Sequence, residues 1–99
     1  MNILLVYGGN SCEHDISVIT ACLAKGYFDG NLYSAYFTQD NRCFLVDNAL
    51  TPAQHKKGKF RNSLVFLTGT GKIGILHGRR IFKAISVDVV VICCHGRCG

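Results

Sequence analysis

Nearly continuous apolar runs mark both ends of the chain. Residues 2–7 read NILLVY, and residues 88–93 read DVVVIC. Runs of this length are typical of strands that are covered on both faces in a parallel sheet. We therefore predict two buried parallel strands, with the strand of residues 88–93 at the centre of the sheet.

A glycine turn and a helix follow the first strand. Gly8 and Gly9 permit a sharp turn, and Ser11 is a good N-cap for a helix that begins at Cys12. The apolar residues that recur at helical spacing, and so predict the buried face, are Ile16, Ile19 and Leu23. Gly26 is the predicted C-cap of this helix.

The middle of the chain alternates short apolar segments with polar turns. A strand over residues 32–38 completes a β-α-β unit, and residues 43–46 return as an edge hairpin. Pro52 suits the first turn of a short helix that Gly58 ends. Two or three short strands then form an irregular meander, over residues 64–67, 73–76 and 80–82. The pattern predicts an α/β fold in one domain, residues 1–99.

Composition excludes several classes of protein. The chain has six cysteines but opens directly on a strand, without a signal peptide, so we expect reduced thiols and a cytoplasmic protein. Its apolar runs are too short for the roughly 20 residues of a membrane-spanning helix, so we expect no membrane contact. The net charge of +5 comes without a nucleic-acid-binding motif, which favours a solvated basic face over an RNA or DNA partner.

Two local patterns are too incomplete to predict a cofactor. Residues 69–72, GTGK, match part of a phosphate-binding P-loop, but Phe66 and Ile73 replace its first glycine and its magnesium-binding hydroxyl residue. Soft metal ligands gather near the end of the chain, at Cys93, Cys94, His95 and Cys98. Their spacing matches no common zinc module, so we interpret the thiols as buried and inert and predict no metal site.

Glu13 and His95 are the candidate site residues. Glu13 lies in the first turn of the predicted helix, at the carboxyl edge of the first strand, where open α/β sheets hold their ligands. His95 follows the last buried strand and should reach the same edge. Each residue also has an ordinary structural interpretation, Glu13 as a better helix start and His95 as a loop histidine.

The segments around these two residues resemble motifs of one protein family. Residues 6–17, VYGGNSCEHDIS, resemble the first motif of D-alanine–D-alanine ligases, in which a strand leads into GG-x-S-x-E-[HR]-x-[VI]-S. Residues 94–99, CHGRCG, resemble the family's HG-x-x-G segment, which continues there into Glu-Asp-Gly. Both motifs stand in the family's order, and the resemblance covers the whole chain but only about the first third of such a ligase.

This resemblance implies a fold and an activity. The fold is a three-layer Rossmann-like (pre-ATP-grasp) domain with a mainly parallel central sheet and an edge hairpin and meander. In the family, ATP activates one D-alanine as an acyl phosphate, and the amine of a second D-alanine attacks it to give the dipeptide used in peptidoglycan. The matching positions imply that Glu13 and His95 are catalytic and that Glu13, Ser17, His95 and Gly96 bind the first D-alanine, Glu13 at its ammonium group and His95 at its carboxylate.

The resemblance also implies partners. The family's other ATP-grasp domains hold ATP and two magnesium ions, so we expect this chain alone to bind neither and to be inactive. The implied partners are D-alanine, those remaining domains and a second copy in a homodimer. Two alternatives stay open: a D-alanine–D-lactate or D-alanine–D-serine ligase, and a stand-alone flavodoxin-like domain that uses Glu13 and His95 to hold a small zwitterion.

Overall fold

The computed structural model of the chain describes residues 1–9, 14–28, 30–58, 60, 62–67, 69–77 and 80–93. Its elements, in chain order, are β1 (Asn2–Gly8), α1 (His14–Ala24), the 3₁₀ turn η1 (Lys25–Tyr27), β2 (Asn31–Phe37), β3 (Cys43–Val46), α2 (Pro52–Lys57), β4 (Leu64–Leu67), β5 (Lys72–His77), β6 (Arg80–Ser86) and β7 (Val89–Ile92). The predicted strands, edge hairpin, short second helix and meander are all confirmed.

Two sheets form the frame of the molecule. The main sheet has the order β3-β2-β1-β7, in which β1 runs parallel to both β2 and β7 and β3 returns antiparallel to β2. Strands β4, β5 and β6 form a separate antiparallel sheet. The parallel strands bring the carboxyl ends of β1, β2 and β7 to one edge of the main sheet, which is the edge predicted to hold the site.

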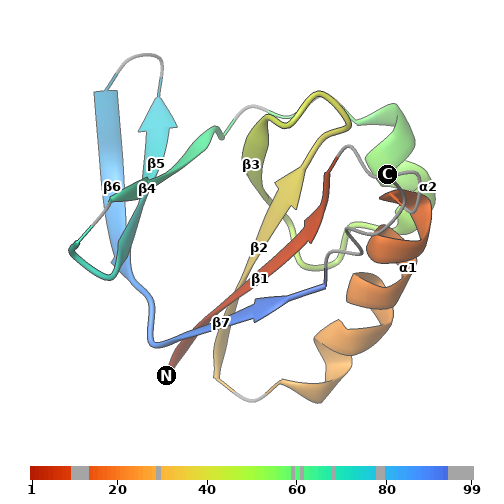
Figure 1. The fold of residues 1–99 in the computed structure, drawn as a ribbon, viewed down its shortest axis with the longest axis horizontal. Helices are drawn as coiled ribbons and strands as arrows, with labels where there is room; N and C mark the ends of the chain where they lie inside the picture. Colours follow the sequence, from red (N-terminus) through yellow and green to blue (C-terminus); the bar gives the residue numbers. More distant parts are fainter. Residues whose placement is uncertain are drawn as a thin grey trace.

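The elements stack in three layers, with the main sheet in the middle. Figure 1 shows α1 and α2 against one face of the main sheet and the small sheet on its other side. Successive side chains of β1 alternate between the two faces: Leu5 and Tyr7 pack with the helices, whereas Leu4 packs with the small sheet. The fold is therefore α/β, as predicted, with an antiparallel sheet as its third layer.

Helix α1 does not bury the face that its apolar spacing predicts. Ile16 is 54% exposed, Ile19 48% and Leu23 71%. The residues that face the sheet are instead His14, Ser17, Val18 and Ala21. These side chains are mostly small or polar, so the helix lies close to the strands and two of its polar groups bind their backbone. The prediction from apolar spacing was wrong because it assumed that polar side chains stay exposed. His14 and Ser17 are buried because the backbone beside the helix supplies hydrogen-bond partners for them.

Two further predictions are corrected. Strand β7 lies at an edge of the main sheet among the described residues, not at its centre, and Val90 and Ile92 are exposed there. Gly26 lies within η1 and lacks the positive φ of a helix C-cap, because α1 continues directly into the 3₁₀ turn. The predicted helix start at Ser11 and Cys12 lies outside the described residues.

The structure also shows that the glycine-rich segment at residues 69–72 is not a P-loop. A P-loop joins a strand to a helix, but residues 69–71 turn between the antiparallel strands β4 and β5. The Thr70 amide and hydroxyl both donate to the Leu67 carbonyl, which closes an ordinary hairpin turn. The segment is therefore a strand connection, and Lys72 begins β5.

Candidate functional site

The turn at the end of β1 requires glycine. Gly8 and Gly9 have φ of +92° and +100°, a backbone region that other residues rarely adopt. A Cβ on Gly8 would collide with the carbonyl oxygen of Phe37, and the Gly9 amide donates to that same oxygen at 2.8 Å. The ends of β1 and β2 are thus held in close contact, which fixes the course of the backbone through residue 9.

Ser17 joins three segments at this edge. Its Oγ accepts a hydrogen bond from the Gly8 amide at 2.9 Å and donates to the carbonyl oxygen of Cys93. Gly8 ends β1, and Cys93 directly follows β7. Ser17 is only 1% exposed, so its hydroxyl is shielded from solvent. Its two hydrogen bonds join α1 to the ends of both strands.

His14 binds the next peptide group of the same turn. Its Nδ1 lies 2.6 Å from the Gly9 carbonyl oxygen, and its Nε2 lies 2.8 Å from the hydroxyl of Tyr36 in β2. A carbonyl can only accept, so Nδ1 carries a proton, and in the neutral ring Nε2 accepts from Tyr36. Burial, with smaller contributions from the charges of Asp15 and Asp40, raises the pKa of Tyr36, which keeps this hydroxyl protonated as a donor.

A second histidine–tyrosine pair joins α2 to β1. His55 Nδ1 donates to the Thr51 carbonyl at 2.7 Å, and its Nε2 lies 2.6 Å from the Tyr7 hydroxyl. Burial raises the pKa of Tyr7 far above its ordinary value and lowers the pKa of His55. Both shifts favour the neutral forms, in which Tyr7 donates to His55. Lys25 approaches the Tyr7 hydroxyl at 3.5 Å.

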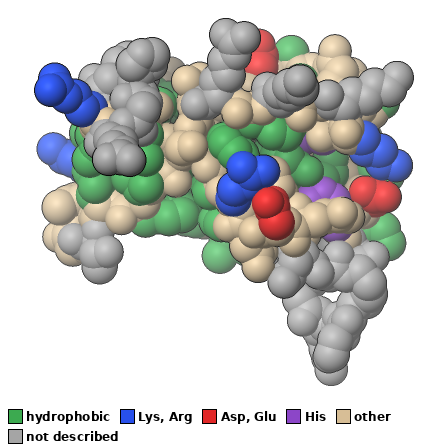
Figure 2. Space-filling view, turned by 90° about the horizontal axis from the view of Figure 1, so that it is seen from above, with side chains coloured by type: hydrophobic (Ala, Val, Ile, Leu, Met, Phe, Trp, Pro, Cys, Tyr) green, Lys and Arg blue, Asp and Glu red, His purple; other side chains and the backbone are tan. Residues whose placement is uncertain are grey.

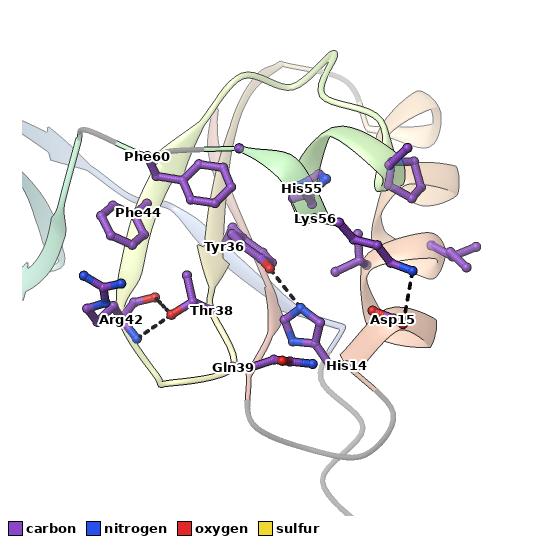
Figure 3. Close-up of a pocket in the computed structure, with 15 residues that line it drawn as sticks. His14, Asp15, Tyr36, Thr38, Gln39, Arg42, Phe44, His55, Lys56 and Phe60 are labelled. Atoms are coloured by element: carbon purple, nitrogen blue, oxygen red, sulfur yellow. Dashed lines mark hydrogen bonds and ion pairs between the residues drawn. The ribbon is translucent and has the colours of Figure 1, made fainter.

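A cavity of about 770 Å³ opens between α1, α2 and the ends of β2 and β3. Figure 2 shows histidine side chains in a hollow between two pairs of oppositely charged side chains. The pocket lining includes Lys56, which pairs with Asp15 at 3.5 Å, and Arg42, which pairs with Asp40 at 2.9 Å. Aromatic and histidine rings form much of its wall: His14, Tyr36, Phe44, His55 and Phe60, most of which Figure 3 shows in the space between Arg42 and Lys56. A pocket of this size and mixed lining is typical of small-molecule sites.

Of the four predicted site residues, the structure describes only Ser17. Glu13, His95 and Gly96 lie outside the described residues, so their predicted roles stay predictions. Their neighbours in the chain are described: Glu13 is bonded to His14, and His95 follows Cys93 by two residues. Ser17 lies at the predicted edge, with its hydroxyl committed to backbone groups. Its role as a substrate contact stays a prediction.

Sequence analysis missed the two histidine–tyrosine pairs. His14 stands beside Glu13 within the motif of residues 6–17, and its position in the first helical turn could have indicated a role at the glycine turn. His55 carries no comparable signal, because its partner Tyr7 lies 48 residues away in the chain. Only the packing of α2 onto the sheet brings His55 and Tyr7 together.

Most of the cysteine and histidine cluster at the end of the sequence, namely Cys94, His95 and Cys98, lies outside the described residues. Across the described ranges, no group of three or more histidine, cysteine or acidic side chains is placed to hold a metal ion. Burial raises the pKa of Cys43 to about 12 and also raises the pKa of Cys93. Cys22, Cys43 and Cys93 are free thiols. The described helices also include none that is long and apolar enough to cross a bilayer.

These features define a class of protein. A parallel sheet whose first strand leads through a glycine turn into a helix, with a pocket at the carboxyl edge, is the arrangement of Rossmann-like ligand-binding domains. Comparison with known proteins finds a likeness to D-alanine–D-alanine ligases, which confirms the predicted resemblance to this family. No protein-family model matches the chain.

The likeness extends along the whole chain but over part of each relative. The chain is 28% identical over 109 residues to a D-alanine–D-alanine ligase of Sulfurovum sp. (strain NBC37-1), covering 100% of this chain and 29% of that protein. The D-alanine–D-alanine ligase of Helicobacter pylori superposes with a TM-score of 0.71 and 24% identity, over 97% of this chain and 31% of that one. The Coxiella burnetii ligase gives 0.75 and 21%, over 98% and 29%. The chain thus spans less than a third of these proteins and shares the fold of that part.

Proposed function

We propose that this chain is the amino-terminal substrate domain of an ATP-dependent D-alanine–D-alanine ligase and contributes to the site of the first D-alanine. The observation that carries the proposal is the parallel order β2-β1-β7. Val6 pairs with Ile92, and the Cys93 amide donates to the Val6 carbonyl at 2.7 Å. The two motif segments, which match one family in sequence, therefore leave the sheet from neighbouring strands.

The residue types suit the two ends of an amino acid. In the proposed complex the Glu13 carboxylate pairs with the ammonium group of D-alanine, and His95 donates to its carboxylate, with the Gly96 backbone beside it. Charge-assisted hydrogen bonds of this kind are about twice as strong as neutral ones. D-alanine carries an ammonium group at one end and a carboxylate at the other, so its site needs an acceptor and a donor in different places. Two neighbouring strand ends can supply these two groups.

ATP and magnesium chemistry belongs, in this proposal, to the rest of the enzyme. The glycine-rich turn at residues 69–71 connects two antiparallel strands and so lacks the geometry of a phosphate cradle. We therefore expect the chain alone to bind no ATP and to make no dipeptide. The complete enzyme would act in the cytoplasm, supply D-alanyl-D-alanine for peptidoglycan and work as a homodimer.

The test of this function is the Glu13→Gln substitution in the complete enzyme. Losing the charge should weaken the first D-alanine by about 1.5–3 kcal/mol, the usual scale of a hydrogen bond to a charged group, and leave the fold intact. Initial rates of D-alanine-dependent ADP release give the Michaelis constant of each of the two substrate sites. D-lactate and D-serine, offered as second substrates, would reveal a related ligase.

Asp47→Asn is the control for Glu13→Gln. It removes a carboxylate at an exposed position after β3, and Asp47 is not among the residues that line the pocket. We expect wild-type constants for this variant. If Glu13→Gln also keeps the wild-type Michaelis constant for the first D-alanine, Glu13 only improves the helix start and the proposed site is wrong.

A further inference from the structure

The hydroxyl of Ser17 is committed to two backbone groups and is closed off from solvent. It has one hydrogen, which it donates to the Cys93 carbonyl, and its oxygen accepts from the Gly8 amide. The side chain is also buried beneath the helix, at 1% exposure. A direct contact with D-alanine would require exposing the group.

We infer that Ser17 is a positioning residue: it locks the turn after β1 and the end of β7 onto α1, and thereby sets Glu13 and His95 relative to one another. The inference rests on the proposed function. Gly8 ends β1 and Cys93 directly follows β7, so both lie where the segments that lead to Glu13 and His95 leave the sheet. A single hydroxyl thus couples both halves of the proposed site.

The neighbouring bonds explain why this one hydroxyl matters. Around Gly8 and Gly9, the Gly9 amide is held by Phe37 and the Gly9 carbonyl by His14, which leaves the Gly8 amide to Ser17. At the other strand, the Cys93 amide is held by Val6 and the Cys93 carbonyl by Ser17. Removing the hydroxyl would deprive the buried Gly8 amide and the part-buried Cys93 carbonyl of this partner at once.

Small displacements at such a site are costly in rate. A misplacement of about 1 Å, even by a change away from the reacting atoms, can lower a rate by roughly 100-fold. The segments that lead to Glu13 and His95 come from opposite ends of the sequence and meet through the pairing of β1 with β7. Ser17, on α1, bonds to Gly8 of β1 and to Cys93 directly after β7 through one oxygen atom.

The experiment compares Ser17→Ala, Ser17→Thr and Thr20→Ala in the complete enzyme. Thr20 is an exposed hydroxyl residue on the same helix, and its variant should match the wild type. We expect Ser17→Ala to lower kcat/KM for the first D-alanine by roughly 10- to 100-fold, and Ser17→Thr, which keeps a hydroxyl, to recover part of the loss. If Ser17→Ala fails to fold, Ser17→Cys keeps the shape of the side chain, with a larger atom that forms weaker hydrogen bonds, and should show the same loss.

Amide hydrogen exchange without ligand separates positioning from substrate contact. Positioning predicts that the Gly8 amide exchanges at least tenfold faster in Ser17→Ala than in the wild type, in parallel with the loss of kcat/KM. Unchanged exchange at Gly8, or faster exchange with wild-type kinetics, would overturn the inference. A wild-type enzyme without ligase activity would instead overturn the proposed function, and with it the role given to Ser17.

Discussion

The two faces of the main sheet are built by different means. On the face toward the small sheet, the buried cluster is wholly apolar: Leu4, Ala35, Leu64, Ile73, Ile75 and Ile85. On the helix face, buried tyrosine, histidine and serine side chains form specific hydrogen bonds to each other and to the backbone. Apolar contacts have no preferred direction, whereas hydrogen bonds fix distances and angles. The comparison indicates that one face supplies stability and the other sets the geometry of the proposed site.

The largest effect should come from the apolar face. Ile73 is 2% exposed, and Ile73→Ala should lower the free energy of unfolding by about 2–5 kcal/mol through lost burial and a residual cavity. Urea unfolding followed by circular dichroism measures this change. Ile81→Ala, at a position that is 49% exposed, is the control and should cost much less. Equal losses at the two positions would contradict a core centred on Ile73.

A smaller effect should follow on the helix face. Tyr7→Phe removes the hydroxyl that donates to His55 and leaves the buried Nε2 of His55 without that partner, which should cost about 1–3 kcal/mol. The same urea titration applies, with Tyr27→Phe at an 87% exposed position as the matched control. If both variants keep wild-type stability, the polar face contributes geometry but no stability, which would sharpen the contrast between the faces.

The smallest effect is a dependence of the free energy of unfolding on pH near neutrality. We expect it to come from His55 on the helix face. Burial, and more weakly the charge of Lys25, lowers the pKa of His55 from its ordinary 6.5. As the pH falls below about 6.5, the unfolded chain therefore takes up a proton that the folded chain resists, and the free energy of unfolding decreases. Unfolding titrations between pH 7.5 and pH 5 measure the slope, which for one proton stays below about 1.4 kcal/mol per pH unit.

Two variants test the origin of that slope. His55→Gln removes the titrating ring and should flatten the pH dependence between pH 7.5 and pH 5. Ile73→Ala should lower stability at every pH without changing the slope, because it alters only the apolar face. A slope that survives in His55→Gln would assign the effect to another group.

Sequence patterns predicted the strands well because burial on both faces leaves a direct trace in composition. β1, β2 and β3 appear as apolar or aromatic runs, and the hairpin between β2 and β3 is marked by a polar turn. The same trace could not place β7, since a continuous apolar run is compatible with a central strand and with an edge strand. Neighbour relations between strands depend on topology, which apolar runs do not encode.

The helix face was harder to predict because polar side chains of α1 pack against the sheet there. Ile16, Ile19 and Leu23 dominate the apolar spacing of α1, yet Ser17 and His14 are the buried residues. Their burial is stabilised by backbone partners on β1 and after β7, up to 76 residues away in the chain. The motif around Glu13 identified this region only through its resemblance to a family, and His55 lies outside that motif altogether.

The pairing of β1 with β7 also sets the order of events during synthesis. β1 is translated before both of its partners in the main sheet, and β7, its partner on one side, follows about 80 residues later. At about 5–20 residues per second, β1 waits roughly 4–16 s with one edge unpaired while β2 and β3 can already assemble on the other. Among the described strands of the main sheet, β7 is therefore the last to join, and the bond from Ser17 to Cys93 can form only then.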